Sequence, residues 1–374
     1  MSLVFQTEAF QGLDSCATVW RELEPRAEAP FFLTWDWIGT WLEESRIEPL
    51  VLTGRYGGEI VLLGLLVPWK RSDTRLWSTY GLRLHTTGVA GQDVITIEYN
   101  SFLIDKEWAG RAEPEALAFL TSGISVAGRR RDELHLQGVV SEYESFVPPS
   151  MLAQVVARKP SYRIDLDAVR ASGKPYLDHL SANTRQQIRR SVRLYEQRGK
   201  LETRRARDVG EAMRFVDGLA DLHQRYWTKR GEPGGFGHPF FESFLRRLTE
   251  RCLPRGSIEL VQINCGNEAI GYVYNFVHRG HIYYYLTGFL YEDDPRLKPG
   301  LVSHYMCIEL HLREQARIYD FMAGDARYKA SLGKPGPEML YLIIQRPTGL
   351  LRLENTLRDV KQRVEARLRK RAVL

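Results

Sequence analysis

Two parts of the chain repeat the same order of apolar and polar segments. Residues 30–45 predict a short loop that enters a helix, and residues 49–69 contain two apolar runs around a glycine-rich turn. Residues 239–252 and 258–278 repeat this order, with a Gly-Asn turn between the apolar runs. Because such turns favour β-hairpins, each copy predicts a helix followed by a hairpin. The recurrence predicts a duplicated α/β domain with a junction near Pro160.

The second half of the chain continues with alternating strands and helices. Apolar residues recur every three to four positions where we expect helices, and at every second position where we expect short strands. We expect strands at residues 161–167, 281–290 and 317–323, and helices at residues 176–198, 211–227 and 301–316. The fold class is therefore α/β (α+β), with mixed, largely antiparallel sheets flanked by helices.

This pattern divides the 374 residues into three parts. We expect an N-terminal domain at residues 1–157, a C-terminal domain at residues 158–346 and a basic amphipathic helix at residues 347–374. We expect that helix to pack on the protein or on a partner subunit. Peripheral contact with a membrane surface is the alternative.

Composition favours a soluble globular protein, with 44% hydrophobic and 26% charged residues. The longest strongly apolar run, residues 60–67, is far too short to cross a bilayer, and no N-terminal signal pattern is present. The four cysteines are scattered without a Cys-x-x-Cys pair, so we expect neither a disulfide framework nor a metal site. We expect a cytoplasmic protein with no transmembrane segment.

Positive charge is concentrated in residues 183–207, which hold eight Arg and one Lys against two Glu. Helical spacing places Arg185, Arg189 and Arg193 on one stripe, which suits phosphates or acidic sugars. A tRNA acceptor stem is the alternative ligand, but Tyr195 is the one aromatic residue nearby that could stack on bases. We therefore expect a small anion, a glycan or a protein at this stripe rather than nucleic acid.

The segment Lys298-Pro299-Gly300 precedes the last predicted helix. The first backbone N–H groups of a helix are unpaired and lie at the positive end of its dipole, so they can bind phosphate groups. Gly300 allows a ligand to approach the backbone closely. The segment is a candidate pyrophosphate site, although Pro-Gly before a helix is also an ordinary turn.

Several segments together resemble the GNAT acyltransferase fold. They are AIGYVYNF (269–276), YYYLTGF (283–289), LKPG (297–300) and YDFMAGDARYK (319–329). With PFFLTWDWIGTWL and LHQRYWTKRGEPGGFGHPFFESFL, the chain more closely resembles the CelD/BcsL-type acetyltransferases associated with cellulose and exopolysaccharide synthesis. It is also similar to the Fem-type aminoacyltransferases, which carry two GNAT-like domains.

The resemblance implies that acetyl-CoA or another acyl-CoA binds in the second domain as co-substrate, and that no metal is needed. It implies a pyrophosphate on the first amides of the last helix and a pantetheine arm beside the strand at 283–289. The residues implied in donor binding are Arg296, Lys298, Gly300, Leu301, Val302, Ser303, Leu286 and Gly288. A sugar or a polysaccharide precursor is the implied acceptor.

Residues 318–329 end a predicted strand on a cluster of ionisable groups, which the resemblance places beside the acyl group. Direct acyl transfer needs a base for the incoming amine or hydroxyl and an acid for the leaving thiolate. Tyr328 occupies the place of the GNAT tyrosine acid, and Asp325 or Asp320 would orient the acceptor or take its proton. Lys329 would hold an anionic substrate or stabilise the oxyanion. The alternative is that Asp320 caps the turn and Tyr328 packs in the core.

Residues expected around the acceptor come from separate segments. The set is His223, Arg225, Trp227, Arg185, Arg189 and Tyr285. His223, Arg225 and Trp227 end one helix beside the Gly/Pro-rich loop at 228–239, and packing at the helix end is their alternative role.

These observations favour an acyl-CoA-dependent N- or O-acyltransferase that acts by direct transfer on a sugar, a polysaccharide precursor or another small polar acceptor. Two alternatives stay open, namely an aminoacyl-tRNA-dependent Fem-like transferase and a non-catalytic GNAT-like module in exopolysaccharide synthesis. The N-terminal copy lacks a counterpart of DARYK (325–329), so we expect a degenerate scaffold or a contribution to the acceptor cleft.

Overall fold

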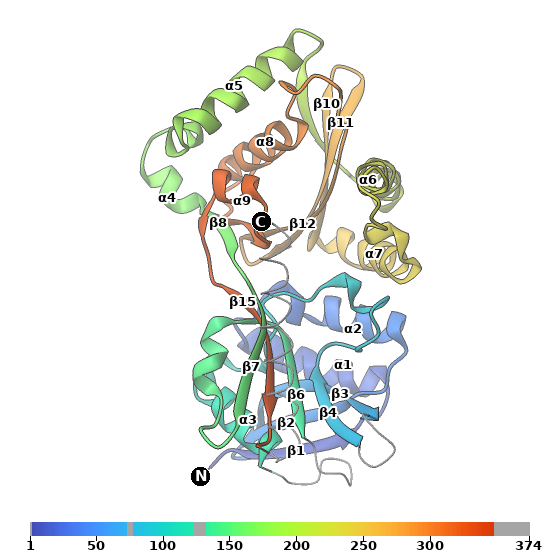
Figure 1. The fold of residues 1–374 in the computed structure, drawn as a ribbon, viewed down its shortest axis with the longest axis vertical. Coiled ribbons are helices and arrows are strands. Elements are labelled where there is room, and N and C mark those ends of the chain that lie inside the picture. Colours follow the sequence, from blue (N-terminus) through green and yellow to red (C-terminus); the bar gives the residue numbers. More distant parts are fainter. Residues whose placement is uncertain (1, 73–77, 123–131, 348–374) are drawn as a thin grey trace, which may run out of the picture.

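The computed structural model describes residues 2–72, 78–122 and 132–347. Two sheets flanked by helices lie at opposite ends of an elongated molecule (Figure 1). The predicted α/β fold class is confirmed. Within these residues, no helix has both the length and the apolar character that a membrane span requires. The basic helix expected at residues 347–374 lies outside the described residues except for Pro347.

The first sheet, as far as it is described, has eight strands in the order β1-β2-β3-β4-β6-β15-β7, with β5 paired to β3. Its strands are β1 (Val4–Ala9), β2 (Leu50–Tyr56), β3 (Glu59–Ser72), β4 (Ser78–Leu84), β5 (Leu103–Ile104), β6 (Glu133–Val140), β7 (Leu152–Lys159) and β15 (Met339–Gln345). Helices α1 (Leu13–Leu23), α2 (Trp35–Ser45) and α3 (Ala112–Thr121) accompany it. We call this unit the first domain.

The second sheet, within the same limits, has seven strands in the order β14-β8-β13-β12-β11-β10-β9. Its strands are β8 (Ser161–Asp165), β9 (Leu201–Arg205), β10 (Ile258–Cys265), β11 (Glu268–His278), β12 (His281–Phe289), β13 (Ile318–Ala323) and β14 (Lys334–Pro335). Its helices are α4 (Leu166–Ala171), α5 (Ala182–Glu196), α6 (Val209–Thr228), α7 (Pro239–Cys252), α8 (Pro299–Arg313) and α9 (Arg327–Leu332). We call this unit the second domain.

The two sheets are built to one plan. The β2–β3 and β10–β11 hairpins stand at matching places, as the sequence repeat predicted. Each sheet also contains a parallel pair at a matching place, β4 with β6 and β12 with β13, while its other pairs are antiparallel. The duplication is therefore visible in the strand order and the strand directions.

Each domain receives a strand from the other half of the chain. Strand β8 follows β7 directly in sequence but lies in the second sheet between β13 and β14. Strand β15 returns to the first sheet and lies between β6 and β7 (Figure 1). The predicted boundary at 157/158 falls inside β7, two residues before that strand ends, whereas the predicted junction near Pro160 lies between β7 and β8. Strand β15, which the division places with the C-terminal domain, pairs in the first sheet.

One predicted helix is shorter than expected. The pattern predicted a helix from Tyr176, but α5 begins at Ala182. The Ser181 hydroxyl accepts a hydrogen bond from the Thr184 N–H at 3.2 Å and caps the helix there. The preceding segment, Tyr176–His179, forms a separate 3₁₀ turn.

Aromatic side chains of the two domains pack together in one core. Phe31 before α2 stacks on Phe276 of β11, with ring centroids 4.3 Å apart. Trp37 of α2 meets Phe244 of α7 edge to face, at 4.8 Å between centroids. All four side chains are buried. Because large aromatic rings contribute strongly to interface energy, this core fixes α2 against α7.

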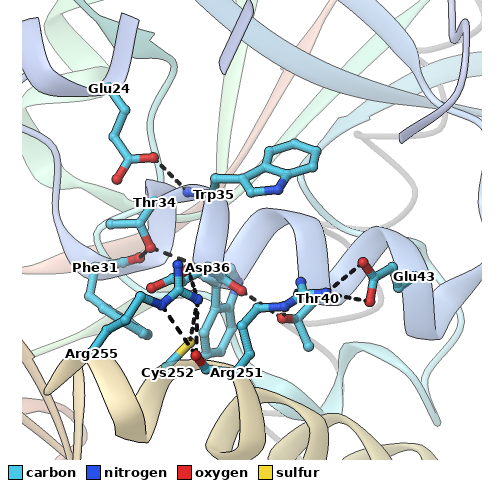
Figure 2. A network of polar contacts seen from close by, with 11 residues as sticks. Glu24, Phe31, Thr34, Trp35, Asp36, Thr40, Glu43, Arg251, Cys252 and Arg255 are labelled. Carbon is cyan, nitrogen blue, oxygen red and sulfur yellow. Dashed lines mark hydrogen bonds and ion pairs between the residues drawn. The ribbon is translucent and has the colours of Figure 1, made fainter. Parts of the chain in front are cut away.

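Polar contacts surround this core (Figure 2). The Arg251 guanidinium of α7 donates to both carboxylate oxygens of Glu43 at 2.6 and 2.7 Å, and to the Thr40 hydroxyl at 3.1 Å. Arg255 pairs with Asp36 at 2.7 Å. A forked arginine contact restricts orientation as well as distance, so these pairs set the angle between α2 and α7.

We expect Phe31→Ala to lower the free energy of unfolding by about 3–5 kcal/mol, because it leaves a cavity where a fully buried ring stacked on Phe276. Urea unfolding measures this change. Val4→Ala is the control, since Val4 is 62% exposed and should change stability by under about 0.5 kcal/mol. A Phe31→Ala effect as small as that of the control would contradict an energetically important interface.

Candidate active site

The site lies where two parallel strands of the second sheet separate. Residues His281–Tyr283 of β12 pair with Ile318–Asp320 of β13, and the register stops there. Tyr285 is an extra residue in β12, because Tyr284 and Leu286 face consecutive residues of β11. Such a bulge bends the strand away from its neighbour. The divergence of β12 from β13 leaves a cleft between them.

One cavity of about 460 Å³ extends from this cleft toward the start of α8. Its lining includes Leu286 and Phe289 from β12, Lys298 before the helix, and Gly300 and Leu301 in the first turn. We call it the α8 cavity. Its walls are largely apolar, while one end is formed by the positive terminus of a helix.

A second cavity of about 520 Å³ lies between the two domains. Glu98 and Lys159 reach it from the first domain, and His223 and Lys329 reach it from the second. We call it the interdomain cavity. It shares His223, Trp227, Tyr284, Tyr285, Leu286 and Tyr328 with the α8 cavity. The two cavities therefore meet; the α8 cavity is mostly apolar, whereas charged and apolar residues both line the interdomain cavity.

Tyr328 stands at this junction. Its hydroxyl donates to the Tyr284 hydroxyl at 3.2 Å, and Tyr284 in turn lies 3.0 Å from the Thr287 hydroxyl. Burial raises the pKa of Tyr328 well above its ordinary value, with the neighbouring Tyr284 adding to the shift. Tyr328 therefore stays protonated and can donate a proton or a hydrogen bond to a group in the cleft.

The first domain delivers Glu98 to this cleft through residues 96–100. The Ala323 N–H at the end of β13 donates to the Glu98 carboxylate at 2.7 Å. Burial raises the pKa of Glu98 from 4.5 to about 7, while the bond from Ala323 and the charge of Lys329 oppose the rise. A carboxyl group with that pKa can accept a proton near neutral pH. Sequence reasoning missed Glu98, because nothing in its own segment links it to β13.

A glycine allows residues 96–100 to lie where they do. Gly138 in β6 has a φ of 73°, and a Cβ added there would lie 2.2 Å from the Ile97 carbonyl oxygen. The Asn100 N–H also donates to the Gly138 carbonyl at 2.8 Å. The segment therefore crosses directly over the β6 backbone on its way to the second domain.

Residues 182–330 match the acetyltransferase (GNAT) domain family. The chain carries a GNAT-type acetyltransferase domain. This domain match supports an acyltransferase. No curated protein matches the chain.

Solved structures share the fold of nearly the whole chain at low sequence identity. FemX is 10% identical, with a TM-score of 0.56, and the alignment covers 92% of this chain and 97% of FemX. A conserved protein of unknown function from Bacteroides thetaiotaomicron VPI-5482 is 10% identical, with a TM-score of 0.53 over 92% of this chain and 100% of that one. L-PGS from Bacillus licheniformis is 10% identical, with a TM-score of 0.50 over 88% of this chain and 92% of that one.

Two of the predicted catalytic residues of the GNAT domain line the cleft and two do not. Tyr328 and Lys329 line it, and the Lys329 ammonium donates to the Ala323 carbonyl at 2.6 Å. Burial lowers the pKa of Lys329, against the opposing charges of Glu98 and Asp320. Asp325 is exposed and lies outside both cavities.

Asp320 is fully buried and lies behind the cleft rather than in it. Its carboxylate accepts hydrogen bonds from the Tyr99 hydroxyl at 2.6 Å and the Met322 N–H at 2.7 Å, and lies 3.0 Å from the His281 ring. With its lone pairs engaged by these groups, Asp320 holds the first domain against β13. The structure favours this structural role over proton transfer.

Some of the predicted donor-binding residues line the α8 cavity and others do not. Lys298, Gly300, Leu301 and Leu286 line the α8 cavity. Val302 and Ser303 lie on the fully buried face of α8, and the Val302 N–H already donates to the Lys298 carbonyl at 3.0 Å. Arg296 is held by Asp294 with hydrogen bonds of 2.8 to 3.1 Å. Gly288 lies outside the cavity, where a Cβ would come within 2.4 Å of the Leu219 carbonyl oxygen of α6.

Three of the predicted acceptor residues meet at the junction of the cavities, namely His223, Trp227 and Tyr285. The His223 ring lies 3.0 Å from the Thr287 carbonyl oxygen and accepts the Gly235 N–H at 3.3 Å, so it ties the loop after α6 to β12. The Tyr285 hydroxyl donates to the Ile95 carbonyl of the first domain at 2.5 Å.

The three predicted acceptor arginines lie outside both cavities. Arg185 and Arg189 of α5 approach Asp178 at 3.0 and 3.8 Å. Arg225 of α6 is exposed and pairs with Asp221 at 2.8 Å. Their predicted role in acceptor binding therefore has no support from their positions.

One cluster in the described part of the chain could geometrically hold a metal ion, formed by Glu259, His311 and Glu314. Arg205 pairs with both carboxylates, and the His311 ring lies 3.0 Å from Glu259. Arg205 and the His311 ring thus already occupy oxygens of these acids, and the cluster gives no reason to assign a metal.

We expect Glu98→Gln to stabilise the protein at pH 8 by about 1–3 kcal/mol and to change little at pH 4. The pKa of Glu98 in the folded protein, about 7, exceeds the ordinary 4.5. Between these two pH values the folded protein therefore keeps a proton on Glu98 that the unfolded chain has lost. The contribution of Glu98 to stability therefore falls as pH rises from 4.5 to 7. Glutamine has no such charge to bury, yet its carbonyl can still accept from Ala323.

Urea unfolding of both forms at pH 4, 6 and 8 measures this difference. Glu59→Gln is the control, since Glu59 is exposed in the β2–β3 turn region. A stability difference between wild type and Glu98→Gln that does not vary with pH would show that the Glu98 pKa is not raised.

Proposed function

We propose that this protein is an acyl-CoA-dependent N- or O-acyltransferase that transfers an acyl group directly to a small polar acceptor. One observation carries the proposal. The largely apolar α8 cavity, which ends on a helix N-terminus, meets the interdomain cavity and its charged residues at Tyr328. A thioester in the first cavity would therefore face an acceptor in the second.

The α8 cavity suits the donor in both shape and chemistry. Leu286 and Phe289 offer apolar walls to a pantetheine arm. Lys298 and the first turn of α8, with Gly300 and Leu301, offer a cation and backbone N–H groups to a pyrophosphate. Acetyl-CoA is the donor expected from the resemblance, and a longer acyl chain would need room in the same cleft.

The residues at the junction can perform the proton transfers of this reaction. The acceptor nitrogen or oxygen forms a bond to the acyl carbon while the bond from that carbon to sulfur breaks. Glu98 takes the proton from the acceptor, and Tyr328 gives its proton to the leaving thiolate. Both act from fixed positions, since Glu98 is bonded to Ala323 and Tyr328 to Tyr284.

Charge in the interdomain cavity narrows the class of acceptor. Lys159 and Lys329 bring two cations and Glu98 brings an acid. An anionic group of the acceptor could pair with the lysines, and its nucleophilic amine or hydroxyl could give a proton to Glu98. A sugar or a polysaccharide precursor, the acceptor that the CelD/BcsL resemblance implies, fits this description when it carries an acidic group.

A Fem-like aminoacyl transfer from aminoacyl-tRNA is the second candidate. FemX and L-PGS share this two-domain fold over most of the chain, and several arginines of α5 are exposed. The same cleft would then hold an aminoacyl ester instead of a thioester. Steep salt dependence of binding to tRNA would distinguish this candidate.

Calorimetric titration with acetyl-CoA, longer acyl-CoAs and bulk tRNA at two salt concentrations tests the donor. We expect acyl-CoA binding, and we expect Gly300→Glu to weaken it at least about tenfold, because a carboxylate at the α8 terminus repels phosphates. Gly91→Glu is the matched control, since a side chain at Gly91 meets open space. Binding to tRNA alone would favour aminoacyl transfer, and acyl-CoA binding without turnover of any acceptor would favour a non-catalytic module.

Kinetics test the two proton-transfer roles. We expect kcat/KM to rise with pH through about 7, where Glu98 ionises, and Glu98→Gln to remove this rise while lowering kcat/KM by about 10²–10⁴. We expect Tyr328→Phe to lower kcat more than it raises KM, because its hydroxyl acts on the leaving group. Asp325→Asn is the control, as Asp325 lies outside both cavities. Unchanged activity in Glu98→Gln and Tyr328→Phe would overturn these assignments.

A further inference from the structure

A third cavity, of about 500 Å³, adjoins the α8 cavity at the end of α6. Arg225, Tyr226, Lys229 and Arg230 line it from the α6 side, and Tyr291 lines it from the end of β12. We call it the α6 pocket. It shares Tyr226, Phe289 and Tyr291 with the α8 cavity, so these rings form the boundary between the two.

Aromatic rings at this boundary are stacked and partly open to solvent. The rings of Tyr226 and Tyr291 lie 5.2 Å apart at an angle of 30°. Tyr291 is 55% exposed, although it is a large ring in a protein that buries most of its aromatic residues. The Arg230 guanidinium lies 3.9 Å from the Tyr226 ring centroid, so a cation is held beside the stack. An exposed ring of this kind can stack on a base.

The charges on the two sides of the α8 cavity mouth differ in sign. The loop from Tyr291 to α8 carries three consecutive acids, Glu292, Asp293 and Asp294. Arg198 and Arg296 pair with two of them, Glu292 and Asp294, so these cations are already partly neutralised. Asp293 has no ion pair in the described part of the chain, so a bound phosphate would meet repulsion from its charge on this side.

The α6 side carries three exposed cations within six residues. Arg225 shares its charge with Asp221, whereas Lys229 and Arg230 pair with no acid in the described part of the chain. A polyanionic group that leaves the α8 cavity would therefore be drawn toward α6 rather than toward the acidic loop. The cations and the exposed ring together match a phosphorylated nucleoside.

We propose that the α6 pocket binds the 3′-phosphorylated adenosine head of the acyl-CoA donor. The base stacks on the exposed Tyr291 ring, and the phosphates contact Lys229 and Arg230. This inference rests on the proposed function, since it places the remainder of the same donor. It also moves Arg225 from the predicted acceptor site to the donor side of the cleft.

The test compares the intact donor with its parts. We expect wild-type protein to bind 3′,5′-ADP, and Lys229→Gln/Arg230→Gln and Tyr291→Ser each to weaken binding of 3′,5′-ADP and of acetyl-CoA by about tenfold. We expect turnover of S-acetyl-pantetheine, which lacks the nucleotide, to stay unchanged in Lys229→Gln/Arg230→Gln, since these two residues line the α6 pocket but not the α8 cavity. Arg214→Gln removes an exposed cation of α6 that does not line the pocket, and should leave all three readouts unchanged.

The outcomes separate this inference from the proposed function. Acetyl-CoA binding that is equal in wild type and variants, or wild-type protein that does not bind 3′,5′-ADP, would overturn the α6 pocket as the nucleotide site. Lack of turnover with both thioesters would instead count against the acyltransferase function. Binding of 3′,5′-ADP would still show, independently of turnover, whether the α6 pocket holds the nucleotide. Binding of a CCA-ended oligonucleotide without 3′,5′-ADP would overturn the inference in favour of RNA. Thermal unfolding of each variant shows that these surface changes leave the fold intact.

Discussion

The site depends on one contact, the docking of residues 96–100 of the first domain on the end of β13. Asp320 is buried and receives donors from both domains, so its carboxylate keeps its full set of hydrogen-bond donors only while Tyr99 is in place. A buried carboxylate that loses a donor is strongly destabilised. The same docking brings Glu98 to the Ala323 N–H. The position of a proton acceptor in the cleft is thus set by a contact that the fold itself requires.

The exchanged strands and the aromatic interface hold the two domains in the relative position that this docking needs. Strand β8 is held in the second sheet and β15 in the first, so the chain crosses between the domains in two places. Phe31 and Phe276 then fix the faces that meet, and the Arg251–Glu43 pair restricts their angle. Small rotations between two independent domains would displace Glu98 from the cleft. The interface makes such rotations costly, because they would expose stacked aromatic rings to water.

Local patterns predicted the hairpins and the strand-to-helix turn at Gly300, because these depend on residues close in sequence. They also predicted Tyr328 and Lys329 at the cleft, through the resemblance. Glu98 was missed because its partner, Ala323, lies 225 residues away. The sequence also could not show that Asp320 points behind the cleft. The rule that successive strand side chains point to opposite faces fails where the register between β13 and β8 shifts. The expected start of a helix at Tyr176 was wrong because the Ser181 cap outweighed apolar spacing.

The opening between the two parallel strands is a cleft in the second domain and is covered by the chain in the first. In the second domain, β12 and β13 separate and leave a cleft, and α8 begins ten residues after β12 ends. In the first domain, residues 85–102 follow β4 and pack over β6, where the Asn100 side chain donates to the carbonyls of Leu84 and Gln137. This segment thereby covers the opening between β4 and β6 and leaves a smaller cavity there, of about 170 Å³. Glu98 belongs to this same segment, so the residues that cover the opening in the first domain also place a carboxylate in the cleft of the second domain. The duplicated fold therefore yields one site from two copies.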